Sequence, residues 1–254
     1  MKTIALYSIK GGVGKTAACV NLAYLAAAEC AATLLCDLDP QGSSTFYFRI
    51  RPKSQYDSRK FLKGGKRIDK AIRGTDYEGL DLLPSDLSYR NLDIMLNDTS
   101  HSRRRLKRLL ARFKGEYDYV FLDCPPNIPL VSENVFTAAD QILVPMIPTT
   151  LSLLTYEKLT RFFDDTGLAK HKLHPFLSMV ESRKRMHRET IQQIGVAGLN
   201  PLESAIPYRA EIEQMGLYRA PLNRHRPHSA GAQAFAQLWR EVKTQLLGET
   251  LDGH

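Results

Sequence analysis

A glycine-rich loop near the start of the chain constrains the fold more than any other feature. Residues 8–16 read SIKGGVGKT, follow a short apolar run and open an Ala-rich helical segment at 15–30. Glycines at this point let backbone N–H groups close around a phosphate, and the start of a helix adds a partial positive charge. The order of strand, loop and helix therefore predicts a phosphate-binding loop in an α/β unit.

The rest of the chain alternates short apolar runs with helical patterns. Helices are expected at 15–30, 102–114 and 229–247, and strands at 2–8, 33–38, 80–84, 118–123, 141–147, 175–180 and 203–206. Several runs are apolar on both faces, as in parallel strands that helices cover on both sides. We therefore expect an α/β fold with a doubly wound, mainly parallel sheet flanked by helices, forming one P-loop domain over 1–254.

Charge and cysteine content limit the function classes. The chain has 35 Lys and Arg against 27 Asp and Glu, and 49–115 alone has 18 basic and 8 acidic residues. This excess favours an anionic partner. No apolar run is long enough to span a bilayer. The cysteines show no paired spacing, so we expect no zinc site and no disulfide framework but buried thiols in a cytoplasmic protein: Cys19, Cys30, Cys36 and Cys124.

The loop resembles the deviant Walker A motif of the ParA/MinD family of ATPases. Ile9 stands where the common P-loop has glycine, and Lys10 precedes the first two glycines. The resemblance implies that Lys10 crosses the interface of an ATP-sandwiched homodimer to contact the other protomer's nucleotide. Lys15 would reach the β- and γ-phosphates and Thr16 would ligate Mg²⁺. The residues implied in ATP binding are Lys10, Gly11, Gly12, Val13, Gly14, Lys15, Thr16, Ala17 and Pro207.

Two aspartate motifs follow in the order of that family. DLDPQG at 37–42 resembles the segment whose later aspartate, here Asp39, orients the attacking water and whose earlier one, Asp37, lies near Mg²⁺. VFLDCPP at 120–126 resembles the Walker B strand, whose aspartate, here Asp123, holds the hydration shell of Mg²⁺. The implied catalytic residues are Lys10, Lys15 and Asp39, and the implied metal-binding residues are Thr16, Asp37 and Asp123. Because aspartate is a weak base, we expect slow hydrolysis that a partner stimulates.

Two further positions refine the nucleotide site by resemblance. AIPYR at 205–209 is similar to the segment that packs near the adenine base, and it brings in Pro207. Ala17 stands where many family members have a second hydroxyl after Thr16, so one contact near the α-phosphate would be missing. We expect weaker nucleotide binding as a result, but not its loss.

Basic residues late in the chain indicate the partner. In the ParA branch the ATP dimer binds DNA non-specifically, and 179–183 is similar to the ParA stretch whose basic residues contact DNA. Such a cluster neutralises phosphates without reading bases. The candidate DNA-binding residues are Arg183, Lys184, Arg185, Arg188, Arg209 and Arg219. A second basic run, at 103–114, shares a helix with an apolar face, and the sequence leaves it open as a solvated surface or a separate site.

The sequence thus predicts a ParA-like ATPase that associates with the nucleoid and partitions or positions a cargo, with a ParB-like or adaptor protein stimulating hydrolysis. A MinD-like membrane-cycling ATPase stays open, because 229–247 has an apolar stripe. Its polar side carries both signs of charge, so packing within the protein is favoured. A metabolic enzyme on the same scaffold, such as an amide-forming ligase or a relative of the nitrogenase iron protein, is a third alternative.

Overall fold

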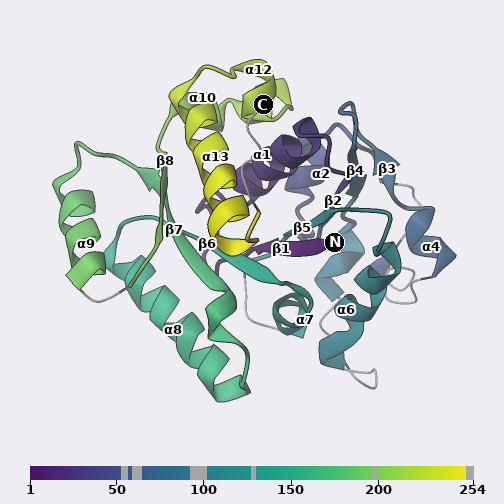
Figure 1. Cartoon of the computed structure of the whole chain (residues 1–254), viewed down its shortest axis with the longest axis horizontal. Coiled ribbons are helices and arrows are strands. Elements are labelled where there is room, and N and C mark those ends of the chain that lie inside the picture. The colour runs from purple at the N-terminus through teal and green to yellow at the C-terminus, as the bar shows by residue number, and fades with distance from the viewer. Residues whose placement is uncertain (53–56, 59–64, 92–101, 127–129, 197–198, 250–254) are drawn as a thin grey trace.

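The computed structural model describes residues 1–52, 57–58, 65–91, 102–126, 130–196 and 199–249. These residues form an eight-stranded sheet in the order β3-β4-β2-β5-β1-β6-β7-β8 (Figure 1). Neighbouring strands are parallel throughout, except that β3 and β4 are antiparallel. The strands are β1 (Lys2–Leu6), β2 (Thr33–Asp37), β3 (Arg73–Gly74), β4 (Leu80–Leu83), β5 (Tyr119–Asp123), β6 (Gln141–Met146), β7 (Leu173–Val180) and β8 (Leu202–Pro207).

Helices connect the strands and end the chain. The α-helices are α1 (Lys15–Ala28), α2 (Ser43–Tyr47), α4 (Lys66–Asp69), α6 (Arg105–Leu110), α7 (Leu130–Ala138), α8 (Thr150–Thr166), α9 (Arg185–Val196), α10 (Ala210–Glu213), α11 (Met215–Tyr218), α12 (Leu222–His225) and α13 (Ala230–Glu241). Short 3₁₀ turns are η1 (Leu87–Asn91), η2 (Ser102–Arg104), η3 (Ala111–Phe113) and η4 (Lys170–Lys172), and a π-helical turn, η5 (Val242–Leu246), extends α13.

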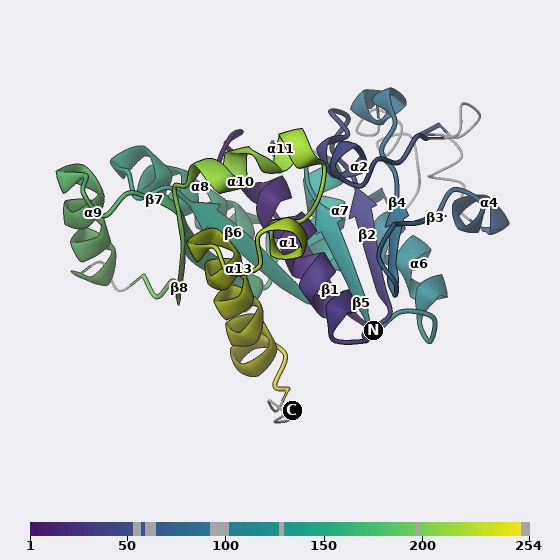
Figure 2. The same cartoon turned by 90° about the horizontal axis from the view of Figure 1, so that it is seen from above.

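The helices form a layer on each face of the sheet, because the central strands are apolar on both faces. In β1, Ile4 and Leu6 pack with α1, α12 and α13. Ala5 and the following Tyr7 pack with α6, α7 and α8 on the opposite face. Both layers are visible when the sheet is viewed from above (Figure 2). The doubly wound α/β fold predicted from the sequence is therefore confirmed.

Two predictions from the sequence need correction. The segment 102–114 is not one helix but η2, α6 and η3 in succession, although its predicted apolar residues Leu106, Leu109, Leu110 and Phe113 are all buried. The prediction that all cysteines are buried is wrong for Cys30, which is exposed. It follows the end of α1 with a φ of 65°, where the chain turns toward β2.

The C-terminal helix packs its apolar stripe into the protein. Phe235, Leu238, Trp239 and Val242 are each at most 1% exposed and belong to the cluster that also holds the apolar face of α1. The Trp239 indole N–H donates a hydrogen bond to Glu29 at 3.0 Å. Packing within the protein, the use that the charge pattern favours, accounts for this stripe. Among the described residues, no helix has both the length and the apolar character that crossing a membrane requires.

Candidate functional site

The glycine-rich loop joins β1 to α1 at the carboxyl edge of the sheet, where open α/β sheets bind ligands. Gly12 and Gly14 have φ values of 69° and 90°, which L side chains rarely adopt. A Cβ at Gly14 would also lie only 2.9 Å from Ser178 Oγ. That hydroxyl donates a hydrogen bond to the carbonyl of Val13 at 2.9 Å. Position 14 therefore needs glycine both for its backbone and for the close approach of β7.

Lys15 is buried within this loop. Its Nζ donates a hydrogen bond to the carbonyl of Lys10 at 2.9 Å, and the residue is 6% exposed. Burial lowers the pKa of Lys15, and the negative charge of Asp123 opposes that shift. An ammonium group held beside the start of a helix is well placed to neutralise phosphate oxygens.

Asp37 and Asp123 end the adjacent strands β2 and β5 at the same register position. Both are completely buried. Asp37 Oδ2 accepts hydrogen bonds from the N–H and the hydroxyl of Thr45, at 2.8 and 2.7 Å. Asp123 Oδ2 accepts one from the Ser44 hydroxyl at 2.8 Å. Burial raises the pKa of both carboxyls, and the charge of Asp123 adds to the shift of Asp37.

The carboxyl of Asp123 fits a hydrated magnesium ion. Its Oδ1 is buried with no hydrogen-bond partner among the described residues. Mg²⁺ keeps several of its waters and is bound through one or two carboxylates and substrate phosphates. The described residues contain no group of three or more His, Cys, Asp or Glu arranged to hold a metal, and this kind of site needs none. Thr16, Asp37 and Asp123 are the residues that would hold the ion and its waters, and the ion would neutralise charge on the phosphates.

The buried carboxyls predict that the nucleotide-free protein loses stability as the pH rises. Each binds its proton more tightly in the folded than in the unfolded chain, so the stabilisation is complete below the unfolded pKa and is lost as the pH rises through the folded pKa. In EDTA, we expect the melting temperature to fall by a few degrees from about pH 5 to about pH 8. Asp37→Asn, which stays neutral, should remove much of this fall; an equal fall in the variant would contradict the assignment.

Hydrogen bonds from Ser85 and from within the loop hold the loop that carries Asp39. The Asp39 carbonyl accepts from the Ser85 hydroxyl at 2.5 Å and from the N–H of Gly42 at 2.8 Å. Asp39 Oδ1 accepts from the N–H of Gln41 at 2.9 Å. Thr45 Oγ1 in turn accepts from the N–H of Ser85 at 3.0 Å. Ser85, just after β4, thus fixes the backbone of Asp39 and the hydroxyl that contacts Asp37.

This arrangement predicts that Ser85 positions Asp39 for hydrolysis. Ser85→Ala removes one of the two hydrogen bonds to the Asp39 carbonyl and leaves that from Gly42. The resulting shift of a catalytic group by a fraction of an ångström should lower kcat by about tenfold. ATP affinity should change little, because Ser85 lies behind the loop and not in the phosphate cradle. Steady-state ATP hydrolysis and nucleotide binding measure the two effects. Ser85→Thr, which keeps the hydroxyl, should recover kcat; if it behaves like Ser85→Ala, side-chain size and not the hydrogen bond is responsible.

An apolar cavity of about 380 Å³ opens beside the phosphate loop. Gly14 and Ala17 line one side, and Pro207, Tyr208 and Phe235 line another. Its position next to α1 and its apolar walls suit a planar base attached to phosphates in the loop. The structure therefore brings Ala17 and Pro207 to the same cavity as Gly14.

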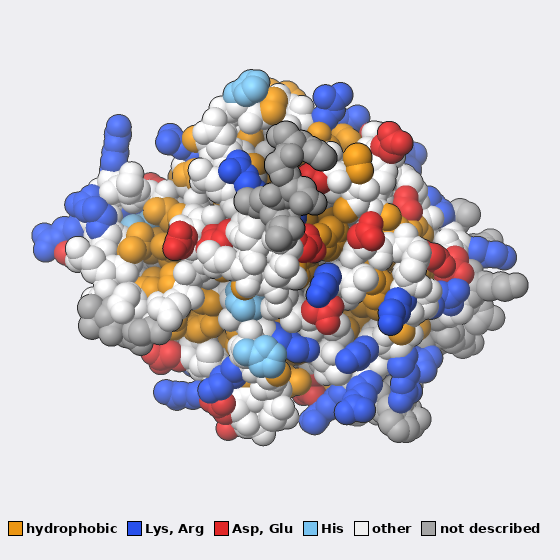
Figure 3. All heavy atoms as spheres, viewed as in Figure 1, with side chains coloured by type: hydrophobic (Ala, Val, Ile, Leu, Met, Phe, Trp, Pro, Cys, Tyr) orange, Lys and Arg blue, Asp and Glu red, His pale blue; other side chains and the backbone are white. Residues whose placement is uncertain are grey.

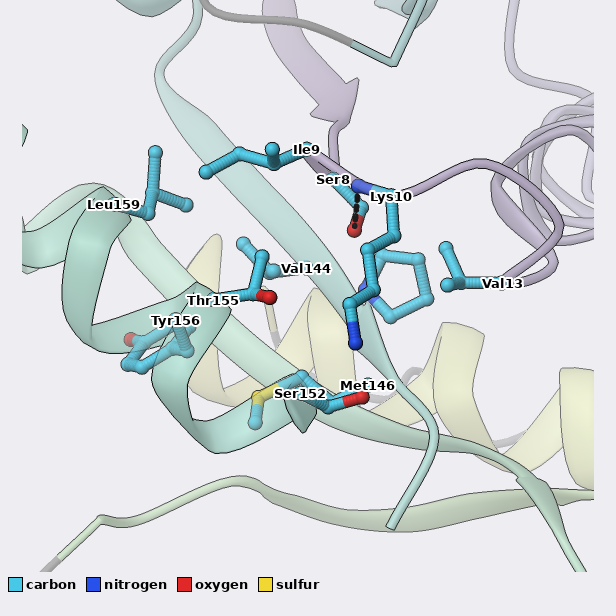
Figure 4. Close-up of a pocket in the computed structure, with 11 residues that line it drawn as sticks. Ser8, Ile9, Lys10, Val13, Val144, Met146, Ser152, Thr155, Tyr156 and Leu159 are labelled. Atoms are coloured by element: carbon cyan, nitrogen blue, oxygen red, sulfur yellow. Dashed lines mark hydrogen bonds between the residues drawn. The ribbon is translucent and has the colours of Figure 1, made fainter. Parts of the chain in front are cut away.

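Lys10 lies apart from the buried carboxyls. Its side chain is half-buried and lines a second, narrow cavity between the loop and α8. Figure 4 shows the side chain running into this cavity, with its ammonium end toward Ser152 and Met146. A contact with another protomer requires the side chain to leave this cavity.

The candidate DNA-binding residues do not form one free basic cluster. Lys184 pairs with Glu181, and Arg185 pairs with Glu189 at 2.6 Å. Arg188 donates to two backbone carbonyls, those of residues 182 and 183, at 2.9 and 3.1 Å. Arg183 and Arg209 are exposed and line an open groove between β8 and α13.

Arg219 lies apart from that groove, at the end of α11. Its Nε donates to the carbonyl of Phe46 at 3.0 Å, and its guanidinium carbon lies 4.4 Å from the centre of the Phe46 ring. It therefore ties α11 to α2. The α9 and α11 segments lie over different parts of the sheet (Figure 2).

Sequence analysis missed the hydroxyl residues that support the site: Ser44, Thr45, Ser85 and Ser178. A signal for two of them was present, because SST follows DLDPQG directly, and hydroxyl residues are common where helices start. Ser85 and Ser178 reach the site only through the strand order. No local pattern distinguishes them from other serines.

Comparisons with known proteins agree with this geometry. A family model described as an AAA domain (AAA_31) matches residues 1–178. The chain is 29% identical over 253 residues to the sporulation initiation inhibitor protein Soj of Bacillus subtilis, and the match covers 95% of this chain and 98% of Soj. It is also 29% identical over 256 residues to the chromosome partitioning protein ParA of Caulobacter vibrioides, and this match covers 95% of this chain and 94% of that protein.

A solved structure extends the likeness to the ligands. Cobyrinic acid a,c-diamide synthase from Mycobacterium smegmatis, solved with a bound ATP analogue and magnesium, matches with a TM-score of 0.83 and 26% identity over 100% of both chains. ATP and Mg²⁺ are therefore the ligands consistent with the loop, the buried lysine and the paired carboxyls described above.

Proposed function

The chain belongs to the ParA/MinD family of P-loop ATPases, and from that membership we propose that it is a ParA-like switch whose ATP-bound dimer holds DNA and partitions or positions a cargo. The observation that carries the proposal is the meeting of a buried Lys15, the carboxyls of Asp37 and Asp123, and a separately held Lys10 at one edge of the sheet. The relatives that match over nearly the whole chain are named for chromosome partitioning and sporulation control.

The proposed reaction is hydrolysis of ATP to ADP and phosphate. Asp39 orients a water molecule whose oxygen attacks the γ-phosphorus, the bond from that phosphorus to the ADP oxygen breaks, and the water proton leaves with the phosphate. Lys15 and the backbone N–H groups of the loop stabilise the charge that builds on the phosphate oxygens. Asp39 is a weak base, so turnover is slow until a ParB-like or adaptor protein improves its placement.

In this proposal the protein dimerises when it binds ATP, and ATP hydrolysis ends the dimeric state. Lys10 leaves its cavity beside α8 and contacts the nucleotide of the other protomer, so the site is complete only in the dimer. ATP then favours association, and conversion to ADP removes that preference. The ATP dimer associates with nucleoid DNA through exposed cations. Among the described residues, Arg183 and Arg209 have no acidic partner, whereas the neighbouring Lys184 must first leave Glu181.

An amide-forming ligase is the alternative that one observation favours. The open groove lined by Arg183, Arg209 and residues of α13 has a volume of about 650 Å³ and adjoins the apolar cavity through Pro207 and Tyr208. A ligase needs room for an acid substrate at such a place, and the matching solved structure is named as a diamide synthase. The MinD-like membrane alternative is less favoured, because α13 buries its apolar stripe.

The test of the proposed function is ATP turnover by the purified protein with and without DNA. A ParA-like switch hydrolyses ATP to ADP with no acid or amine substrate present, and it pellets with DNA in the presence of ATP and Mg²⁺. A ligase hydrolyses little ATP without its acceptor. Absence of turnover without an acceptor, together with absence of DNA binding, would overturn the proposal. Sedimentation with anionic liposomes would then address the membrane alternative.

A further inference from the structure

The helix α6 presents a row of basic side chains that the nucleotide site does not use. Arg104, Lys107, Arg108 and Lys114 are exposed. Lys107 and Arg108 belong to α6 itself, Arg104 ends the turn before it and Lys114 follows the turn after it, and we call these four side chains the α6 basic face. Figure 3 shows Lys and Arg side chains gathered at the lower right, where Figure 1 places α6 and α4.

The opposite side of this helix is anchored in the core. Leu106, Leu109, Leu110 and Phe113 are at most 7% exposed and pack in the cluster below α7 and α8. The N–H of Leu106 donates to the side-chain oxygen of Asn134 in α7 at 3.1 Å. The basic side chains therefore stand on a firmly held element.

The four cations of this face have no acidic partner among the described residues. The acids nearby are taken by other bases: Glu133 pairs with Arg103 at 2.6 Å, and Asp69 pairs with Arg112 at 2.5 Å. This differs from the start of α9, where Lys184 and Arg185 pair with acids on their own segment. Exposed ion pairs are weak, but a phosphate that binds at α9 must still displace the acidic side chain from each pair. A phosphate that binds at α6 displaces only water.

A further lysine adds to the positive charge instead of relieving it. Burial lowers the pKa of Lys172, the negative charge of Asp140 opposes that shift, and the positive charge of Lys107 adds to it. The Lys172 ammonium donates to the carbonyl of Ala139 at 2.7 Å, so it is held in position.

The α6 basic face lies away from the nucleotide. The turn η3 precedes β5 by five residues, and Lys172 directly precedes β7, so this surface belongs to the amino edge of the sheet. The phosphate loop, Asp37 and Asp123 belong to the carboxyl edge. Figure 2 shows α6 near the start of β1, with α2 and α11 at the opposite edge.

We propose that the α6 basic face is a second contact for the phosphate backbone of double-stranded DNA, and that it acts in every nucleotide state. A protein partner would need apolar or aromatic anchors, and a membrane would need apolar side chains to insert. None of the large exposed apolar side chains of the described residues belongs to η2, α6 or η3: Met1, Phe46, Leu87, Leu151, Leu154, Met186, Tyr208, Leu217 and Tyr218. Cations on a segment that exposes no large apolar side chain suit contacts to phosphates alone. The inference rests on the proposed function only in taking DNA as the anionic partner.

The test replaces three of these cations at once, Arg104→Ala, Lys107→Ala and Arg108→Ala. The control replaces three exposed cations elsewhere, Lys158→Ala, Arg161→Ala and Arg240→Ala, with the same change in net charge. Anisotropy of a labelled random-sequence DNA duplex gives the affinity with ATP, with ADP and without nucleotide, over a salt series. The α6 variant should lose at least about tenfold in affinity in all three states, and its salt slope should fall by roughly 0.9 for each lost contact. ATP hydrolysis without DNA should stay at the wild-type rate.

The outcomes separate this inference from the proposed function. Equal DNA affinity with ATP and ADP in the wild type would overturn the proposed switch but not the α6 contact. An α6 variant that binds DNA as tightly as the control variant, or a wild type that binds no DNA at low salt, would overturn the α6 contact. So would a variant that keeps DNA binding and loses binding to phosphatidylserine vesicles, because the face would then serve a membrane.

Discussion

Lys15→Ala is expected to lower ATP hydrolysis by at least about 100-fold, because the ammonium is the one buried cation of the phosphate loop and stabilises charge on the transferred phosphoryl group. The effect should appear in both ATP binding and kcat, since the same group contacts the ground state and the transition state. Release of phosphate from ATP and binding of a fluorescent ATP analogue measure the two contributions.

The variant should remain folded. In the wild type, the Lys15 side chain is buried with one carbonyl as its hydrogen-bond acceptor. Its removal stabilises the fold by relieving the desolvation of a buried charge, and destabilises it by leaving Asp123 without a nearby cation. The two effects on stability oppose each other. A melting temperature close to that of the wild type would separate loss of chemistry from loss of fold. Lys2→Ala, at an exposed lysine of β1, is the matched control. Hydrolysis within a few-fold of the wild type would show that phosphate is bound elsewhere.

Lys10→Ala is expected to weaken ATP-dependent dimerisation by at least about tenfold while the monomer still binds ATP, because a charge-assisted contact to phosphate is lost only in the dimer. The structure gives a physical basis for this separation. Lys10 lines its own cavity beside α8, and the part of Lys10 that contacts Lys15 is the backbone carbonyl, which alanine retains. The loop should therefore keep its shape in the variant.

Light scattering after size exclusion, with a non-hydrolysable ATP analogue and Mg²⁺, measures the mass of the complex. The wild type should run as a dimer and Lys10→Ala as a monomer at the same concentration. Lys15→Ala, which binds ATP more weakly, should also be monomeric, so ATP binding must be measured in parallel. A Lys10→Ala dimer as stable as the wild type, with the same rate of hydrolysis, would remove the contact across the interface.

The strands and the phosphate loop were predictable because their signals are local. Both Ile4 and Ala5 are buried, so β1 reads as a continuous apolar run, which is typical of a strand covered on both faces. The glycines of the loop stand where the backbone has positive φ or meets another segment closely. Aspartates at the ends of β2 and β5 meet because parallel strands share one carboxyl edge.

The hydrogen bonds behind the loop were not predictable in the same way. Ser85 reaches Asp39 because β4 pairs with β2 in parallel register, and that pairing is set by the whole sheet. The position of Ser178 opposite Gly14 depends likewise on the course of β7. Such contacts join segments far apart in the chain, and no spacing in the sequence encodes them.

The basic residues show a third case, in which the sequence showed their charge but not the contacts that they make within the protein. Arg219 was predicted to contact DNA, yet its guanidinium is stacked on Phe46, which only the fold could show. The pairs of Lys184 with Glu181 and of Arg185 with Glu189 were visible as charges three and four residues apart. Whether these residues bind DNA stays a prediction, and the pairs predict that they do so less readily than the cations of α6.

The most direct test of the account compares the affinity of the protein for random-sequence double-stranded DNA with ATP and with ADP, both with Mg²⁺, at one fixed salt concentration. We expect binding to DNA to be at least about tenfold tighter with ATP. ATP brings two protomers together, so one dimer contacts the DNA phosphates with two copies of each basic residue. Lys15→Ala should show the weaker, ADP-like affinity in both nucleotides. Equal affinities with ATP and ADP in the wild type would contradict the claim that this chain is a nucleotide-controlled DNA switch.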